Sequence, residues 1–158
     1  MKNIKKYIKD IILFLVILFL WCLSGFIFKV DYSYYKMLKL PFFALDGKYI
    51  SIIWFIIYIL NTISIIKVSK ITNIFKNHDY LYILITNYIA NELFIYFFFK
   101  LMSPFLGLCI TIITMISTYF LMQETKLISK KSSYFLIPYL VYSIYAFILM
   151  ATIYFMNF

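Results

Sequence analysis

Polar side chains inside long apolar segments are the residues of this sequence with the clearest capacity for chemistry. Glu92 lies near the middle of an apolar block that runs from about Tyr80 to Phe99. An ionisable group at that depth of a membrane helix is costly, so it indicates either a function or a structural hydrogen bond to a neighbouring helix. Both interpretations stay open, including a transporter subunit or structural membrane partner that uses Glu92.

Amides and aromatic rings recur at helical spacing in three apolar segments, which places each set on one helix face. If the three faces converge, their rings and polar groups suit a flat, hydrophobic ligand with a few polar edges. Aromatic core packing together with interfacial tyrosines is the alternative explanation. The three sets are Trp54, Tyr58 and Asn61; Asn87, Asn91, Phe94 and Phe98; and Pro138, Tyr142, Tyr145 and Leu149, with Tyr139 beside them.

The sequence contains no pattern typical of a catalytic or metal-binding site. His78, beside Asp79 at the start of an apolar block, is expected to be a solvated junction residue and not a metal ligand or general base. Cys22 and Cys109 lie inside apolar segments, where a thiol behaves as a small hydrophobic group. The three glycines are not clustered, which argues against a phosphate-binding loop. We therefore predict no catalytic residues, no metal site and no required cofactor.

The composition points to the bilayer as the solvent of this chain. Hydrophobic residues make up 65% of the 158 residues and charged residues 13%, and the mean hydropathy is +0.95. Soluble domains are about 45–50% apolar and about 25% charged, and a chain of this length could not bury such an excess in water. Since the alternation of barrel strands is also missing, we predict an all-α integral protein of the cell membrane.

Five apolar blocks are long enough to cross a hydrocarbon core of about 30 Å as helices. They predict a single membrane domain over residues 1–158, built as a bundle of five transmembrane helices. The long first connection, residues 29–48, has room for local structure outside the membrane. The expected helices span approximately residues 8–28, 49–66, 80–99, 104–122 and 134–156.

All 15 basic residues are lysines, and the net charge is +9. Because they separate the apolar blocks and form no continuous basic face, we expect contact with membrane lipid headgroups and no binding of nucleic acid. Ten of the lysines fall in the N-terminal tail and the second and fourth connections, which places the N-terminus inside. The first block follows lysines as a signal peptide does, but it continues to Phe28 without a small-residue cleavage pattern, so we expect it to be retained.

Motifs in the first connection and in three helices match one known family in order and spacing. They are Tyr34, Tyr35, Leu38, Leu40, Pro41 and Phe43 in the connection; Trp54, Ile57 and Tyr58; Asn91, Phe94, Phe98 and Phe99; and Leu136 to Tyr142, followed by Leu149 and Met150. With these motifs the chain resembles the TspO/MBR (translocator protein / tryptophan-rich sensory protein) family over roughly residues 34–157. Members of that family are membrane proteins with five helices.

The chain departs from the family pattern chiefly by losing indole rings. Tyr34, Phe43, Phe94 and Tyr142 stand where the family has tryptophan, and Met150 replaces a late asparagine. Aromatic character is kept at the first four positions, while the N–H of the indole is lost. The remaining departures are Leu40 in place of a lysine, and Leu45 and Asp46 in place of two prolines.

The resemblance implies a sensory, regulatory or transport-like protein that binds porphyrins, haem-like tetrapyrroles or similar hydrophobic ligands between its helices, under the first connection. For bacterial members it also implies light- and oxygen-dependent porphyrin breakdown that uses pocket tryptophans. Because Trp54 is the one such indole plainly present, we predict binding ahead of enzymatic activity. The resemblance alone suggests a homodimer. The predicted ligand-binding residues are Trp54, Tyr58, Asn91, Phe94, Phe98, Pro138, Tyr139, Tyr142, Tyr145, Tyr34, Pro41 and Phe43.

Overall fold

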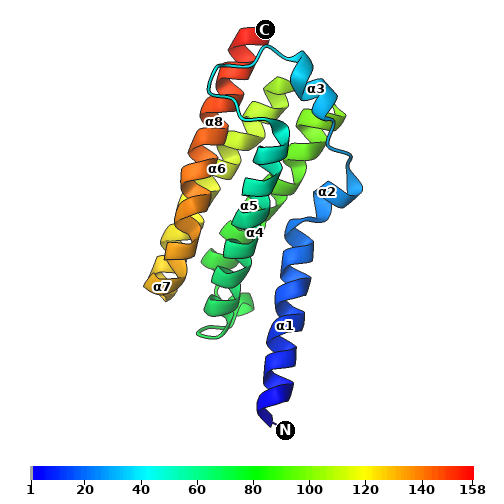
Figure 1. The fold of residues 1–158 in the computed structure, drawn as a ribbon. Helices are drawn as coiled ribbons and strands as arrows, with labels where there is room; N and C mark the ends of the chain where they lie inside the picture. The colour runs from blue at the N-terminus through cyan, green and yellow to red at the C-terminus, as the bar shows by residue number, and fades with distance from the viewer. Residues whose placement is uncertain (1) are drawn as a thin grey trace.

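The computed structural model describes the backbone of residues 2–158 and the side chains of residues 7–158, and this part of the chain is helical without β-strands (Figure 1). The long helices follow the apolar blocks, and short helical turns fill several of the connections. In chain order the elements are α1 (Lys2–Trp21), α2 (Leu23–Ile27), α3 (Tyr32–Met37), α4 (Gly47–Ser69), the 3₁₀ turn η1 (Ile74–Lys76), α5 (His78–Ile95), the π-helical turn η2 (Tyr96–Lys100), α6 (Pro104–Ile128), α7 (Lys130–Ser133), the 3₁₀ turn η3 (Tyr134–Leu136) and α8 (Ile137–Asn157).

Four helical segments of the described chain are long and apolar enough to cross a membrane, so the protein is an all-helical, multi-pass membrane protein. Helix α1 is not in this set, because charged residues, among them Lys9 and Asp10, are concentrated in its N-terminal half. The helix expected over residues 8–28 also differs in shape, because it is divided at Cys22 into α1 and α2. The four segments are Gly47–Ser69, His78–Lys100, Pro104–Ile128 and Lys130–Asn157.

Capping side chains, and not the first apolar residue, set the starts of α4 and α6. Asp46 accepts a hydrogen bond from the Lys48 N–H, so α4 begins two residues before the expected Tyr49. Ser103 accepts from the Leu106 N–H ahead of α6. That helix then continues through the polar residues to Ile128, beyond the expected end at residue 122. A polar segment can stay helical where lysine and glutamate side chains reach water.

Helix α6 forms the centre of the bundle and packs along both α5 and α8 (Figure 1). Its buried face is rich in threonine, and Thr111, Thr114 and Thr118 each return their hydroxyl to a carbonyl four residues earlier. Small side chains of this kind allow neighbouring membrane helices to approach closely. Hydrophobic clusters lie at the two ends of the bundle, one around Phe98 and Leu149 and the other around Tyr80 and Leu136.

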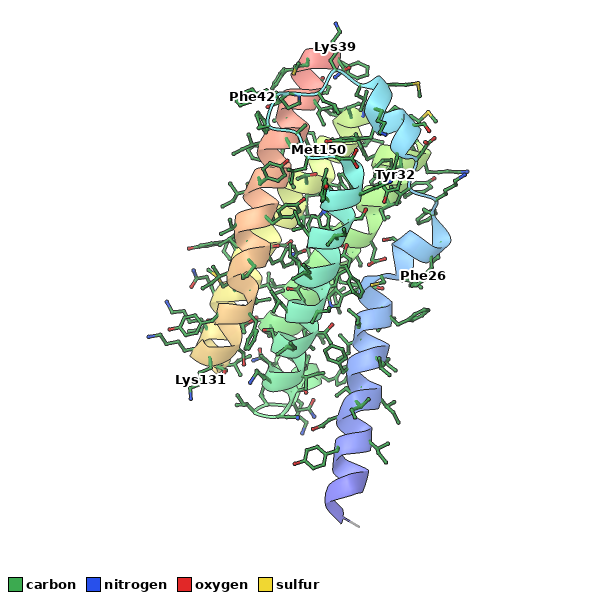
Figure 2. The ribbon with its side chains drawn as sticks, in the orientation of Figure 1. Phe26, Tyr32, Lys39, Phe42, Lys131 and Met150 are labelled. Carbon is green, nitrogen blue, oxygen red and sulfur yellow. The ribbon has the colours of Figure 1, made fainter. Side chains whose placement is uncertain are left out.

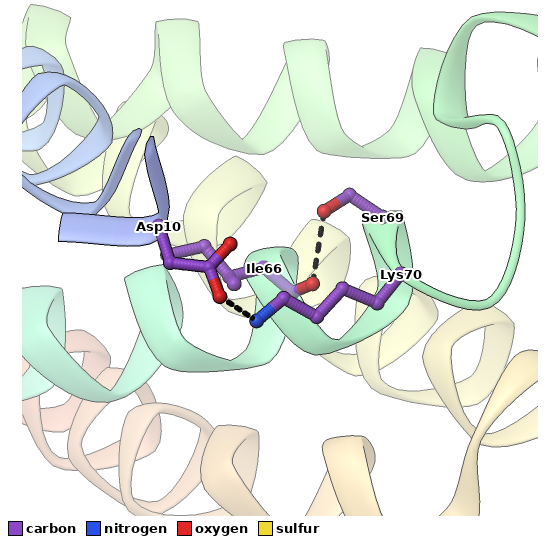
Figure 3. A network of polar contacts seen from close by, with 4 residues as sticks. All are labelled: Asp10, Ile66, Ser69 and Lys70. Atoms are coloured by element: carbon purple, nitrogen blue, oxygen red, sulfur yellow. Dashed lines mark hydrogen bonds and ion pairs between the residues drawn. The ribbon is translucent and has the colours of Figure 1, made fainter. Parts of the chain in front are cut away.

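Helix α1 packs against α4, and its N-terminal end projects beyond the bundle in Figure 1. The two helices are joined at the C-terminal end of α4 by an ion pair of 2.6 Å between Lys70 Nζ and Asp10 Oδ2 (Figure 3). Both side chains are at least one-third exposed. The neighbouring Ser69 hydroxyl donates to the Ile66 carbonyl and takes no part in the pair.

We expect Lys70→Gln to lower the free energy of unfolding by no more than about 0.5 kcal/mol, because exposed ion pairs contribute little. Denaturation in a detergent mixture with increasing SDS measures this difference. Lys76→Gln, on an exposed lysine of η1, is the matched control. A loss above about 1.5 kcal/mol would show that the pair is shielded from solvent and holds α1 in place.

Candidate functional site

A cavity of about 260 Å³ lies in the half of the bundle nearest the first connection. Figure 2 labels two residues of its lining, Tyr32 and Met150, which lie toward the same end of the molecule as α3 and the C-terminus. Side chains from α1, α2, α3, α4, α5, η2, α6 and α8 contribute to the wall. Most of them are aromatic or aliphatic, which suits a hydrophobic guest.

Seven of the twelve predicted ligand-binding residues line this cavity. Trp54 packs edge-on against Tyr142 at 5.3 Å between ring centroids, and Tyr142 stacks on Tyr145 at the same distance. The Tyr142 hydroxyl is buried and has no hydrogen-bond partner within the described chain, so it is free to bond to a guest. The seven residues are Trp54, Tyr58, Asn91, Phe94, Phe98, Tyr142 and Tyr145.

The other five predicted residues lie outside the lining. Tyr34 packs on Phe98 and Phe43 packs on Tyr145, so both support lining rings from behind. Tyr139 is fully buried behind Trp54, at 5.8 Å between centroids. Pro41 is buried within the first connection, whereas Pro138 is exposed on the outer face at the start of α8, away from the cavity. The sequence places each proline in its segment, but it does not show which way the ring points.

A hydrogen-bonded network forms the polar floor beneath the cavity. Tyr58 donates to Asn91 Oδ1 at 2.7 Å, and Asn91 Nδ2 donates to the Tyr139 hydroxyl at 3.2 Å. Tyr139 in turn donates to Asn87 Oδ1 at 3.0 Å. The Asn87 amide N–H groups are shared among the Thr114 carbonyl and the hydroxyls of Ser117 and Thr118. Asn61, predicted on the same face as Tyr58, is fully buried and does not line the cavity.

Sequence reasoning missed the contribution of the first helix and of α6. Trp21 is 2% exposed, stacks on Tyr58 at 5.7 Å and lines the cavity, so both tryptophans of the chain reach the site. Cys22 and Ser24 line it beside Trp21, and Thr111 lines it from α6. The sequence does carry a signal for the first helix, because a serine and a glycine interrupt its apolar run soon after the tryptophan.

Two tyrosine side chains and one asparagine side chain hold the first connection in place over the cavity through hydrogen bonds. The Tyr145 hydroxyl donates to the Phe43 carbonyl and accepts from the Leu45 N–H, and Tyr35 donates to the Leu45 carbonyl. Asn157, near the end of α8, both accepts from and donates to the Lys39 backbone. The connection is therefore held through its backbone. Burial raises the pKa of the Tyr35 phenol to about 12, and nearby Tyr145 and Asp46 add to the effect.

We expect Tyr35→Phe to lower the free energy of unfolding by about 1 kcal/mol at pH 8, the net value of one hydrogen bond. The folded chain favours the neutral phenol, so this contribution is complete below the unfolded pKa of about 10 and is lost as pH rises toward 12. SDS unfolding of wild type and variant at pH 8, 10 and 11 tests this, with exposed Tyr49→Phe as control. A difference that stays constant across these pH values would contradict the prediction.

The arrangement has the features of a binding site for a flat apolar molecule. Its aromatic rings can stack on a planar guest, while the Tyr142 hydroxyl and the Asn91 amide offer hydrogen bonds at its edge. Within the described residues, no group of three histidine, cysteine or carboxylate side chains is placed to hold a metal ion. Glu92 lies next to the lining and accepts a hydrogen bond of 2.5 Å from the Ser24 N–H, so its carboxyl group is engaged with the first helix.

Comparison with known proteins agrees with this architecture. Residues 11–156 match the model of the TspO/MBR family. The chain is 31% identical over 148 residues to the tryptophan-rich protein TspO of Bacillus cereus, which covers 94% of this chain and 96% of that protein. It is 29% identical over 153 residues to the uncharacterized membrane protein YtaB of Bacillus subtilis, covering 97% and 99%. These matches confirm the resemblance predicted from the sequence motifs, and the chain belongs to the TspO/MBR family of membrane proteins.

Proposed function

We propose that this protein binds a flat, hydrophobic ligand of the porphyrin or haem-like class in the cavity between its helices, in a sensory, regulatory or transport-like role. The observation that carries the proposal is the aromatic lining around Trp54, Tyr58 and Tyr142, in a cavity where α4, α5, α8 and the first connection meet. Membership of the TspO/MBR family supports the same class of ligand.

The size of the cavity limits how much of such a ligand it can enclose. Binding sites for small molecules usually measure about 300–1,000 Å³. The 260 Å³ found here accommodates part of a tetrapyrrole, such as one or two of its pyrrole rings. A complete macrocycle is larger than this space, so we expect part of the ring to extend beyond the cavity, or the wall at Tyr32 and Tyr35 to move outward.

The proposal includes a fifth membrane crossing made by α1 and α2 together. An α-helix rises about 1.5 Å per residue, so the largely apolar residues 11–28 extend at most about 27 Å, close to the thickness of the hydrocarbon core. The lysines of α1 would then lie at one membrane surface, and the cavity wall formed by Trp21 would lie deep in the bilayer. Cysteine accessibility from the two sides of the membrane tests this crossing.

Protoporphyrin titration of the purified protein in detergent is the direct test of binding. Because Trp21 and Trp54 both line the cavity, we expect saturable quenching of tryptophan fluorescence. Tyr142→Ala should weaken binding about tenfold by removing a ring and a hydroxyl from the wall, equivalent to about 1.4 kcal/mol. Exposed Tyr119→Ala on α6 is the matched control. Linear, non-saturable quenching, or equal affinity in both variants, would refute the proposal.

One observation favours light-dependent porphyrin breakdown as a second candidate function. Trp21 joins Trp54 at the cavity, so two indole rings stand beside a bound guest where the sequence motifs offered one. Illumination of the porphyrin complex in air, with oxygen as the oxidant, should then yield a new absorption spectrum. A spectrum identical to that of porphyrin illuminated without protein would remove this candidate.

A further inference from the structure

The first helix is broken at the depth of the cavity, and the break frees backbone groups, among them the Leu20 carbonyl and the Ser24 N–H. Helix α1 ends at Trp21 and α2 begins at Leu23. In an uninterrupted α-helix the Ser24 N–H would donate to the Leu20 carbonyl, four residues earlier. Here that bond is replaced, since both groups bond to side chains of α5. Inside a membrane, where water cannot take over, a lost backbone bond of this kind is costly unless protein groups satisfy it.

Two side chains of α5 take the place of the missing bond. The Tyr88 hydroxyl donates to the Leu20 carbonyl at 3.1 Å, and Glu92 Oε2 accepts from the Ser24 N–H at 2.5 Å. Tyr88 and Glu92 are four residues apart, so they lie one above the other on the same face of α5. The Ser24 N–H and the Leu20 carbonyl, which would bond to each other in a continuous helix, are thus satisfied by Glu92 and Tyr88 respectively. Trp21 packs edge-on against Tyr88 at 5.5 Å and completes the contact.

The break gives the cavity its open side. Ser24 and Gly25 of α2 line the cavity, and so do Ser51 and Phe55 of α4. Gly25, Ser51 and Phe55 are also exposed, so the cavity reaches the molecular surface between α2 and α4. A Cβ atom placed on Gly25 would meet nothing within 4 Å, which shows open space at this point. In Figure 1, α2 turns away from the line of α1 toward α3.

We propose that Tyr88 and Glu92 are positioning residues that hold the first helix broken, and that the gap they maintain between α2 and α4 admits a hydrophobic ligand from the lipid phase. The inference rests on the proposed binding function and adds the route to the site. It also gives Glu92 a role that needs no proton transfer, because its carboxyl oxygen replaces the carbonyl that Ser24 would otherwise use. If the pair is removed, Leu20 and Ser24 can bond to each other, and the helix straightens.

Spin-label distances test the role of the pair without any ligand. Cys22 and Cys109 are first replaced by serine, and labels are attached at Phe26→Cys on α2 and Ile52→Cys on α4, both exposed positions. We expect Glu92→Ala and Tyr88→Phe each to shift the distance distribution between α2 and α4, and Glu92→Gln, which keeps an acceptor oxygen, to leave it in place. Since one variant could fail to fold, the other provides the same reading. An unchanged distribution in a folded variant would overturn the role of the pair.

Stopped-flow binding of protoporphyrin tests the route. We expect Gly25→Trp to slow association and dissociation alike by about tenfold, so that affinity stays within about threefold, because a bulky ring in the gap obstructs passage. Gly25→Ala, which adds one methyl group in open space, is the control. Wild-type rates in Gly25→Trp would overturn the entrance. If wild type itself binds no protoporphyrin, the proposed function fails, while the spin-label distances still decide the role of Tyr88 and Glu92.

Discussion

Replacing Tyr139 with phenylalanine is expected to lower the free energy of unfolding by about 2–3 kcal/mol, although the change removes a single oxygen atom. The Tyr139 hydroxyl accepts from Asn91 and donates to Asn87, and all three side chains are buried. Without it the Asn87 carbonyl oxygen keeps no side-chain partner and Asn91 loses one donor contact. A buried polar group left without a hydrogen-bond partner destabilises the fold by more than the net free energy that the hydrogen bond had contributed.

Denaturation with SDS in mixed micelles measures this loss, and Tyr119→Phe on the exposed face of α6 is the matched control. The network also predicts an interaction between sites. Once Asn87 is replaced by alanine, Tyr139→Phe should cost clearly less, because the orphaned carbonyl is gone. Equal losses in the two backgrounds would mean that Tyr139 contributes through packing against Trp54 and Trp21, and not through the amides.

Much of the fold could be predicted because hydrophobic length is a direct physical requirement of a bilayer. The apolar blocks around Trp54, Asn91 and Tyr142 gave helices at the right places, and the family relationship confirms the motifs that they carry. Helix ends were less predictable. The cap at Asp46 and the continuation of α6 to Ile128 depend on local hydrogen bonds and on side chains that reach water, which a hydropathy pattern does not contain.

The candidate site was predictable where a helix face alone decides it. Trp54 and Tyr58 on α4 and Asn91 and Phe94 on α5 follow a helical period and line the cavity together. Glu92 shows the limit of this reasoning, because the sequence left function and structural bonding open. Its partner is the backbone of Ser24, 68 residues away, and no side-chain pattern marks a backbone N–H that a helix break has released.

The second large effect is expected at Gly107, where helix α6 packs against Met150 and Phe98, two residues of the cavity lining. A Cβ atom added there would lie 2.9 Å from Met150 Cε, at the flexible end of that side chain, and 3.0 Å from Cδ2 of the more rigid Phe98 ring, so both neighbours would have to shift. We expect Gly107→Val to lower the free energy of unfolding by about 3 kcal/mol, the upper end for overpacking. A branched side chain cannot rotate out of this contact, because its rotamers are restricted in a helix.

The same substitution should also weaken protoporphyrin binding. Phe98 and Met150 both line the cavity, so when the new side chain displaces them they move into the space that the ligand would occupy. Gly25→Val is the matched control for stability, since an added side chain there meets open space. Unfolding in SDS and fluorescence titration of the folded fraction separate the two effects. If Gly107→Val is as stable as wild type and binds equally well, α6 must shift away from α8 at little cost, and the close helix contact at Gly107 does not determine the shape of the cavity.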